Sequence, residues 1–197
     1  MVERAKIIFI HGASSSGKST LARAVQAQIG EPFWHVSIDH LRDSGTVPME
    51  RFRRGDFRWK EYRARFFDGF HRSLVAYASA GNNLLLEHIL EEPGWASELA
   101  VMLQPFDVFF VALHCELDEL VRRERLRADR PIGSAADDFH RIHFGQRYDL
   151  ELGPGQAAED AAAQLISAWS VRRAPSAFDA LALEAQAGSG RSQVQEQ

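Results

Sequence analysis

The sequence predicts an α/β fold with a central parallel sheet of five strands and helices on both of its faces. Short apolar runs rich in β-forming residues alternate with amphipathic segments of helical period along most of the 197 residues. The first of these runs leads directly into a glycine-rich turn and then into a helical pattern. With 45% hydrophobic and 25% charged residues, a chain of this length can bury one core of ordinary size. We therefore expect one three-layer domain over residues 1–173.

The individual elements follow from the hydropathy pattern in chain order. Apolar runs predict strands at residues 7–10, 33–38, 83–87, 107–113 and 148–152. Apolar residues three or four apart predict helices at residues 21–29, 59–80, 91–102, 117–127, 135–144 and 157–173. Residues 42–57 show no sustained period, and we expect a loop or lid there.

The C-terminal segment, residues 174–197, differs in composition from the rest of the chain. It is rich in Ala, Gln, Ser and Gly, so it has little apolar surface to bury. A helix could form over residues 176–187, and residues 188–197 are expected to form a tail. We therefore predict a flexible or loosely helical extension without a catalytic domain of its own.

Composition and charge argue against several classes of protein. A net charge of −4 gives no overall attraction to nucleic acid or to an anionic membrane. No segment has the length of a membrane span or the apolar core of a signal peptide. The single cysteine, Cys115, allows no internal disulfide and favours a reducing compartment, and no Cys/His group has the spacing of a zinc site. We expect a soluble, cytoplasmic protein whose partners are small molecules.

The glycine-rich turn has the pattern G-x-x-x-x-G-K-S between the first expected strand and the first expected helix. This pattern in this context is typical of a P-loop, whose backbone N–H groups surround phosphate at a helix N-terminus. Lys18 is expected to reach the β- and γ-phosphates of a nucleotide, and the Ser19 hydroxyl is expected to bind Mg²⁺. The expected nucleotide-binding residues of the loop are Gly12, Ala13, Ser14, Ser15, Ser16, Gly17, Lys18, Ser19 and Thr20. The sequence therefore predicts a P-loop NTPase fold that binds ATP with Mg²⁺.

Asp39 directly follows the second expected strand. Ligands bind at the carboxyl ends of the strands in open parallel sheets, so this carboxylate is expected near the P-loop. A carboxylate there can accept the proton of an acceptor hydroxyl and orient its oxygen toward the γ-phosphate. The alternative is a structural role in which Asp39 caps the following turn. We favour the general base.

Arg123 and Arg127 lie four residues apart on one expected helix, and Arg130 follows shortly after the end of that helix. Their guanidinium groups can converge on one anion. The alternative is a solvated helix face with ordinary ion pairs. We favour a lid over the phosphates, in which Arg123 contacts the nucleotide and Arg127 and Arg130 stabilise the transferred phosphoryl group.

Glu87 and His88 end the third expected strand. Glu87 could hold the hydration shell of Mg²⁺, bind the substrate or play a structural role. His88 could contact the substrate, although a histidine in such a place is more often a packed side chain. Both are therefore candidate substrate-binding residues.

Basic residues interleave with aromatic residues over residues 51–65. This segment could form an acceptor pocket, a plain surface or a platform for single-stranded nucleic acid. We favour the acceptor pocket, in which Phe52 and Trp59 contact the substrate, and expect no nucleic-acid partner.

Several of these motifs together resemble the chloramphenicol phosphotransferase-like P-loop kinases. The resemblance is carried by the serine-rich P-loop, by Ile38-Asp39-His40-Leu41 and by the pattern Arg123-Glu124-x-x-Arg127-x-Asp129-Arg130-x-x-Gly133. It extends to His143 and to Tyr148-Asp149-Leu150-Glu151, in the order that the family shows. The resemblance implies a nucleoside-kinase-like fold and an ATP-dependent kinase for a hydroxyl of a small molecule. It also implies that Asp39 is the base, that Lys18 binds the phosphates, and that Arg127 and Arg130 close over them.

The chain departs from this family at three places. Glu87-His88 stands where the family has an acidic pair, Gly153 stands where it has an aspartate, and residues 42–60 are strongly basic. These departures leave phosphoryl transfer in place and the acceptor open, so that a nucleoside, a sugar or another metabolite is an alternative to chloramphenicol. A nucleotide-dependent regulatory or RNA-binding module is the hypothesis from a different class. The sequence leaves the oligomeric state open.

Overall fold

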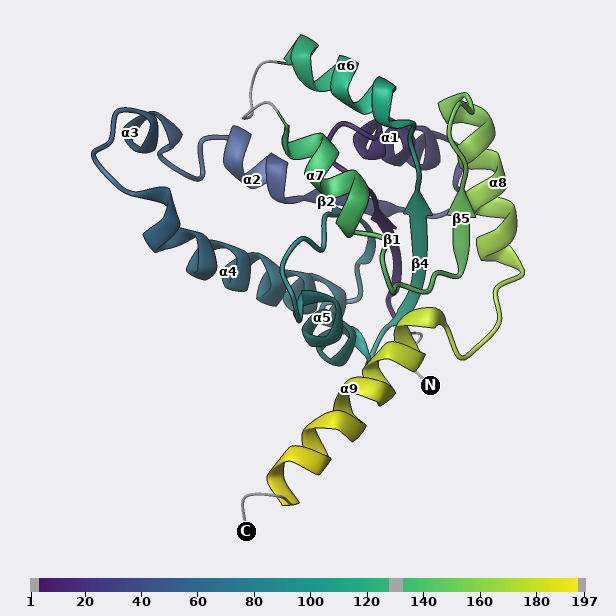
Figure 1. The fold of residues 1–197 in the computed structure, drawn as a ribbon. Coiled ribbons are helices and arrows are strands. Elements are labelled where there is room, and N and C mark those ends of the chain that lie inside the picture. Colours follow the sequence, from purple (N-terminus) through teal and green to yellow (C-terminus); the bar gives the residue numbers. More distant parts are fainter. Residues whose placement is uncertain (1–3, 128–132, 195–197) are drawn as a thin grey trace.

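The sheet in the computed structural model, which describes residues 4–127 and 133–194, has five strands (Figure 1). These are β1 (Lys6–His11), β2 (Phe33–Ser37), β3 (Asn83–His88), β4 (Asp107–Leu113) and β5 (Leu150–Leu152). They lie in the order β2-β3-β1-β4-β5, and all neighbouring strands run parallel. The predicted α/β fold with a five-stranded parallel sheet is confirmed.

Helices cover both faces of the sheet. One face packs against α1 (Lys18–Gln28) and α8 (Ala158–Ser170), and the other packs against α4 (Trp59–Ser79), α5 (Trp95–Leu103) and α9 (Ala177–Val194). The remaining helices are α2 (Ile38–Asp43), α3 (Met49–Arg53), α6 (Leu117–Arg127) and α7 (Ser134–Arg141). Figure 1 shows α6 beyond the carboxyl ends of the strands. None of the helices in the described part of the chain is both long and apolar enough to cross a membrane.

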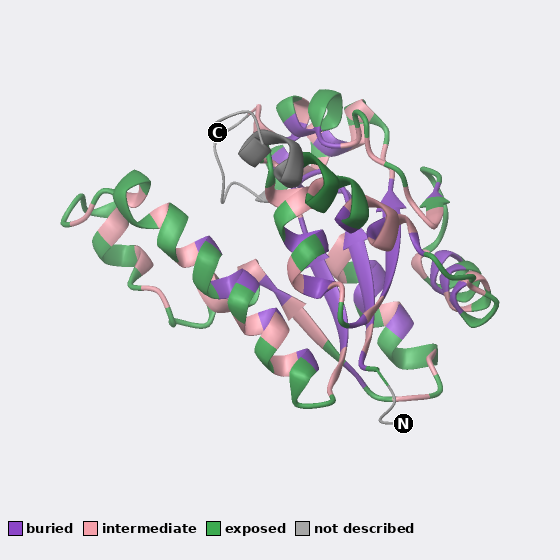
Figure 2. Cartoon of the chain, turned by 90° about the horizontal axis from the view of Figure 1, so that it is seen from below, coloured by how far each residue is buried: buried purple, intermediate pink, exposed green. Residues whose placement is uncertain are grey.

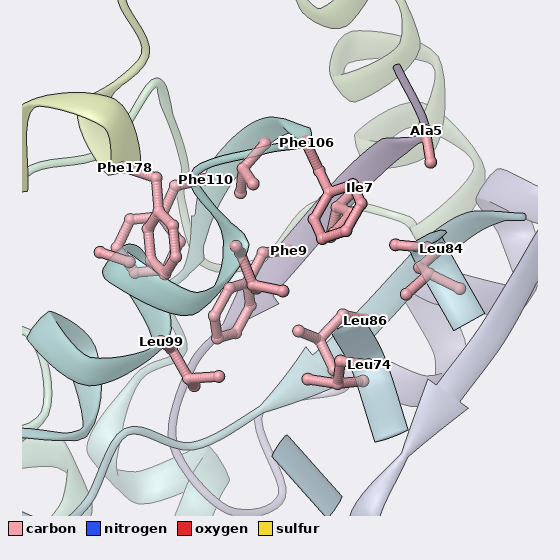
Figure 3. Packing of buried hydrophobic residues seen from close by; sticks show 14 of the residues in the cluster. Ala5, Ile7, Phe9, Leu74, Leu84, Leu86, Leu99, Phe106, Phe110 and Phe178 are labelled. Carbon is pink, nitrogen blue, oxygen red and sulfur yellow. The ribbon is translucent and has the colours of Figure 1, made fainter. Parts of the chain in front are cut away.

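The strands are buried on both faces because their residues are apolar almost without interruption. In β1, Ile7 and Phe9 face the α5 side, Ile8 and Ile10 face the α1 side, and all four are fully buried. Figure 3 shows Phe9 beside Phe178 of the C-terminal helix, with their ring centroids 5.5 Å apart. Figure 2 shows the buried residues concentrated on the strands and on the helix faces turned toward them. This rigid core holds the carboxyl ends of the strands in fixed positions.

Residues 42–57, which we expected to form a loop or lid, contain the C-terminal end of α2 and all of α3. Helix α2 begins directly after β2 because the Ser37 hydroxyl accepts a hydrogen bond from the Asp39 N–H at 3.2 Å and caps the helix. The ring of Phe52 packs against those of Phe57, Trp59 and Tyr62, with centroid distances of 5.6, 5.3 and 5.7 Å. This aromatic cluster joins α3 to the start of α4. We call residues 38–67 the arm, and it projects to the left in Figures 1 and 2.

The C-terminal segment, which we expected to be flexible or loosely helical, forms the continuous helix α9 as far as Val194. Phe178 and Ala182 are buried in the same cluster as β1 and β4. Asp149 fixes the start of α9 because its carboxylate accepts hydrogen bonds from the N–H groups of Phe110 and Ala177, each at 2.8 Å. Leu181 packs against the same cluster, so the few apolar residues of this segment dock the helix. Residues 195–197 of the expected tail lie outside the described residues.

Candidate active site

The P-loop lies between β1 and α1, where the sequence predicts it. Gly17 precedes α1 and has a φ of 103°, a conformation that favours glycine. Gly12 packs so closely against β4 that a Cβ atom there would lie 2.6 Å from the carbonyl oxygen of Leu113. The Lys18 ammonium donates hydrogen bonds to the carbonyl oxygens of Gly12 at 2.9 Å and Ala13 at 2.7 Å. Backbone geometry therefore requires both glycines, and the lysine lies across the loop.

Ser19 and Glu87 connect the P-loop to β3. The Ser19 hydroxyl donates a hydrogen bond to Glu87 Oε1 at 2.9 Å, and His35 Nε2 lies 3.3 Å from Glu87 Oε2. Burial would raise the pKa of the Glu87 carboxyl, but hydrogen bonds from His35 and Ser37 and the charge of Lys18 lower it to about 2. The site therefore presents an ionised carboxylate beside a hydroxyl group.

This oxygen pair could hold Mg²⁺. Within the described residues, no group of three or more His, Cys, Asp or Glu side chains could hold a metal ion by itself. Magnesium in phosphate-transferring sites commonly takes one or two protein oxygens and completes its shell with water and substrate phosphates. Ser19 and Glu87 fit that requirement.

Helices α6 and α7 contact the P-loop on another side. Arg123 Nη1 donates hydrogen bonds to the carbonyl oxygens of Ser15 at 3.3 Å and Ser16 at 3.2 Å. Asp138 of α7 is buried, and its carboxylate accepts a hydrogen bond from the Ser14 N–H at 2.9 Å. The structure thus brings Arg123 to the loop and adds Asp138, which no periodic or motif signal in the sequence indicated.

The side chains of the two expected lid arginines lie outside the described part of the structure. Arg127 is the last residue of α6 and only its backbone is described, whereas Arg130 lies outside the described residues. Glu124 connects α6 to the start of α7. Its carboxylate accepts hydrogen bonds from the N–H groups of Gly133 at 2.8 Å and Ala135 at 2.9 Å. The roles of Arg127 and Arg130 stay predictions.

Asp39 lies in the first turn of α2, at the carboxyl end of β2. Its Oδ1 atom lies 3.0 Å from Arg42 Nη1, and Arg42 also pairs with Asp43 at 2.7 Å. Because Ser37 caps α2, the Asp39 carboxylate is not needed for that structural role. Its side chain is 31% exposed and therefore accessible to a small molecule.

A cleft of about 1730 Å³ connects these groups along the carboxyl edge of the sheet. Its walls include Ser14 to Thr20 of the P-loop and the predicted residues Asp39, Trp59, Glu87, His88 and Arg123. Gly12, Ala13 and Phe52 are not wall residues, and Phe52 supports the wall indirectly through its ring contact with Trp59. Sequence reasoning did not single out Arg42 and Phe67, which also line the cleft. The helical period of residues 59–80 included Phe66 but gave no sign of which positions face a ligand.

Two pairs of histidines form hydrogen bonds in the interior, and one of the four, His88, lines the cleft; His11, His71 and His88 are buried and His143 is half-buried. His11 Nδ1 and His143 Nδ1 are hydrogen-bonded to the Tyr148 hydroxyl at 2.9 and 2.7 Å, and His71 Nε2 lies 3.0 Å from His88 Nε2. Burial lowers the pKa of His71 and of His143 to about 4, and it lowers the pKa of His11 and of His88 well below the usual value. All four rings are therefore neutral at pH 7. The sequence could not reveal these pairs, because tertiary packing brings their members together from separate elements.

Comparisons with known proteins agree with this geometry. Residues 5–170 match the family model of chloramphenicol phosphotransferase-like proteins. A proposed O-phosphotransferase of Mycobacterium tuberculosis strain H37Rv is 24% identical over an aligned length of 196 residues. The alignment covers 89% of this chain and 87% of that protein. The shikimate kinase of Bradyrhizobium diazoefficiens is 30% identical over 138 residues, which cover 68% of this chain and 60% of that enzyme.

Solved structures show the same fold. An APS kinase of M. tuberculosis in complex with AMPPNP and APS superimposes with a TM-score of 0.65 at 20% identity, covering 85% of this chain and 99% of that chain. A gluconokinase from Sinorhizobium meliloti gives a TM-score of 0.56 at 15% identity, covering 85% and 93%. The family model spans most of the sequence and the neighbours are P-loop kinases, so this chain belongs to the chloramphenicol phosphotransferase-like family and has the P-loop kinase fold.

Proposed function

We propose that this chain is a kinase that transfers the γ-phosphoryl group of ATP to a hydroxyl of a small molecule, with Asp39 as the general base. The observation that carries the proposal is that the Asp39 carboxylate lines the same cleft as the P-loop, Lys18 and Glu87. A module that only binds a nucleotide has no need of a second carboxylate in this cleft beside Glu87, which suffices for Mg²⁺. The names of the relatives, an O-phosphotransferase and a shikimate kinase, support the same class of reaction.

The P-loop side of the cleft fits a nucleoside triphosphate. Within helix α1, all of which is described, the first turn has no acidic residue and Gly17 supplies no side-chain cap, so nothing from that turn opposes an anion at the positive end of the helix dipole. Lys18 would exchange its bonds with loop carbonyl groups for bonds with phosphate oxygens. Arg123 brings a second cation to the loop, and Arg127 and Arg130 would close over the transferred group.

Mg²⁺ would be held by the Ser19 hydroxyl, with Glu87 accepting hydrogen bonds from its water ligands. When bound, the ion neutralises charge that develops on the β- and γ-phosphates. The low pKa of Glu87 keeps its carboxylate ionised throughout the physiological pH range.

Asp39 would accept the proton that the acceptor loses. The acceptor hydroxyl gives its proton to the Asp39 carboxylate while its oxygen forms a bond to the γ-phosphorus. At the same time the bond between the γ-phosphorus and the β,γ-bridging oxygen breaks, and ADP leaves with that electron pair. The contact with Arg42 at 3.0 Å fixes the orientation of the carboxylate.

The far end of the cleft would bind the acceptor. Trp59, Phe66 and Phe67 provide flat apolar walls there, and Arg63 lies beside them. Such walls suit a small molecule that contains a ring and a hydroxyl group, which includes chloramphenicol, nucleosides and sugars. These walls therefore fit the proposed reaction with any of these classes of acceptor.

A library of hydroxyl compounds would test the reaction. Phosphorus-31 NMR would detect a new phosphomonoester together with ADP for at least one member. Asp39→Asn should keep Mg·ATP affinity within about twofold and lower turnover by about 10²- to 10⁴-fold, because it removes only the proton acceptor. Lys18→Ala should weaken ATP binding itself.

Asp68→Asn is the matched control because Asp68 is an exposed carboxylate on α4 that pairs with Arg72, outside the cleft walls. It should leave both measurements unchanged. Near-full turnover in Asp39→Asn would refute the base assignment. Tight nucleotide binding without transfer to any alcohol would favour the regulatory module.

A further inference from the structure

The side chains of His71 and His88 form a pair inside the wall of the acceptor end. His88 ends β3 directly after Glu87, lines the cleft and is 2% exposed, and His71 projects from α4 and is 4% exposed. Their Nε2 atoms are 3.0 Å apart, a hydrogen-bond distance that requires one of the two nitrogens to carry a proton and the other to accept it. The two rings therefore have coupled tautomers.

Burial leaves the pair without a positive charge near neutral pH. Both side chains are almost completely excluded from water, and a charged ring in such a place costs far more free energy than a neutral one. With both rings neutral, a proton on His71 Nε2 places the proton of His88 on Nδ1, and the opposite arrangement leaves Nδ1 as an acceptor. His88 Nδ1 can thus serve as a donor or an acceptor, depending on the tautomer that His71 allows.

His88 Nδ1 is buried and has no hydrogen-bond partner among the described residues. An unsatisfied buried polar atom is destabilising, so its presence at a cleft wall calls for a partner that arrives with a ligand. The ring cannot easily turn to find another partner. It is stacked against Phe67 at 5.8 Å and Trp95 at 5.4 Å, and its other nitrogen is held by His71.

Arg63, a charged residue that lines the cleft beside this wall, is already paired. Arg63 lies over the rings of Phe67 and Trp95 at 4.8 and 5.3 Å, and its guanidinium pairs with Glu91 and Glu92. A ligand therefore gains little by bringing a charge to this position. A neutral hydrogen-bonding group can pair with His88 without breaking an ion pair.

We propose that His88 Nδ1 binds a second polar group on the acceptor, beside the hydroxyl that is phosphorylated, and that His71 is a positioning residue that selects the tautomer of His88. This inference rests on the proposed kinase function. It predicts that the acceptor is bifunctional, such as a diol, a hydroxyketone or a hydroxyamide, and that a simple alcohol is a poor substrate.

Two isosteric variants separate the two nitrogens of His88. The amide of His88→Gln reaches the position of Nε2 and can keep the bond to His71, but it removes the polar atom at Nδ1. The amide of His88→Asn lies near the position of Nδ1 and loses the bond to His71. Comparison of the two variants therefore distinguishes loss of the ligand contact from loss of a structural hydrogen bond.

The test uses the full chain labelled with ¹⁵N-histidine, in the presence of Mg²⁺ and AMPPNP. The probes are cyclohexanol, the 1,2- and 1,3-cyclohexanediols and 2-hydroxycyclohexanone, and the His88 signals are assigned as those missing from His88→Gln. We expect a bifunctional probe to shift the Nδ1 signal of His88 and to bind about tenfold more tightly than cyclohexanol. His88→Gln should reduce this preference to about twofold or less, and His88→Asn should retain most of it. In His71→Phe, the Nδ1 shift should report a mixture of tautomers.

Equal binding of cyclohexanol and every bifunctional probe would overturn the inference, as would a Nδ1 signal that no probe moves. The same samples with ATP in place of AMPPNP report phosphoryl transfer separately. Suppose that a probe shifts the Nδ1 signal but neither that probe nor any other tested alcohol is phosphorylated. This result would refute the kinase function and would still support the binding site at His88.

Discussion

The two ends of the cleft are built in different ways. At the nucleotide end, the groups that face a ligand come from the backbone and first helical turn that follow β1, and buried strands on both sides hold them. At the proposed acceptor end, they are side chains of the arm and of β3, supported by aromatic rings such as Phe52 and Trp95. The nucleotide end therefore depends on backbone positions, and the acceptor end depends on packing between side chains.

This difference determines what a mutation can do at each end. A backbone cradle tolerates almost no added atom, because neighbouring strands cannot move without disturbing the core. A cluster of rings on a projecting arm can be repacked with a smaller loss of stability. The same fold can thus keep one nucleotide site while its acceptor specificity changes.

Among the substitutions that compare the two ends, Gly12→Ala at the nucleotide end should have the largest effect. The new Cβ would meet the Leu113 carbonyl oxygen at 2.6 Å and the Ser16 hydroxyl at 2.9 Å, so the P-loop or β4 must shift. We expect a loss of about 1–3 kcal/mol in the free energy of unfolding and a loss of about 100-fold in Mg·ATP affinity. Chemical denaturation and calorimetric titration measure these quantities.

Gly30→Ala is the control for that substitution because a Cβ at Gly30 meets nothing within 4 Å. It should change stability by less than about 0.5 kcal/mol. Equal behaviour of the two alanine variants would contradict the idea that the nucleotide end is a rigid backbone cradle.

The next largest effect should come from Glu87→Gln, at the junction between the two ends. The amide keeps the shape of the side chain but removes the negative charge beside Ser19 and Lys18. We expect kcat to fall by about 10- to 100-fold and the dependence on Mg²⁺ concentration to shift to higher values. A magnesium titration of ATP turnover would measure both, and Glu159→Gln on the exposed side of α8 should change neither. An unchanged Mg²⁺ dependence would assign Glu87 a purely structural role.

The sequence predicted the nucleotide end well because its signals are local. The strand, the loop and the helix are consecutive, and the pattern from Gly12 to Ser19 fixes their geometry through glycine conformation and backbone hydrogen bonds. The alternation of strands and helices was sufficient to predict the parallel sheet in the same way. Asp39 was placed correctly at the edge of the sheet because the carboxyl ends of parallel strands share that edge.

The acceptor end was less predictable because its contacts are distant in the sequence. His71 and His88 come from a helix and a strand, and nothing in either segment indicates that their nitrogens meet. Helix α3 was missed because contacts of Phe52 with rings beyond the turn stabilise it, and these give no helical period. Similarly, Phe178 docks onto the core a helix that extends to Val194, beyond residues 176–187 where the composition allowed one.

The histidines with lowered pKa values should make the stability of the fold depend on pH. An unfolded chain binds protons at histidine near the ordinary pKa of about 6.5, whereas folded His71 and His143 bind them only near pH 4. The unfolded state therefore takes up more protons as the pH falls from about 6.5 to 4, and stability should decrease over that window by roughly 1–3 kcal/mol for His71 and by less for the half-buried His143, whose charge solvent screens in part. Urea denaturation at a series of pH values should show a flatter profile for both His71→Gln and His143→Gln. His140→Gln, at an exposed position on α7, should keep the steep profile. A flat profile for the unmodified chain would show that the histidines are not held neutral.

The smallest effect should come from Phe52→Ala, which loosens the arm without touching the cleft wall directly. Phe52 contacts Phe57, Trp59 and Tyr62, so its removal should let Trp59 move away from the position in which it lines the cleft. Because the ring is only partly buried, we expect a loss of about 1 kcal/mol in stability and a KM for the acceptor that rises about three- to tenfold, with ATP affinity unchanged.

Phe144→Ala removes a ring that is 89% exposed and should alter none of these values. Steady-state kinetics with each substrate varied in turn would measure the two KM values. If Phe52→Ala weakened ATP binding as much as acceptor binding, the arm would have to support the nucleotide as well, and the division of the cleft into two independently built ends would fail.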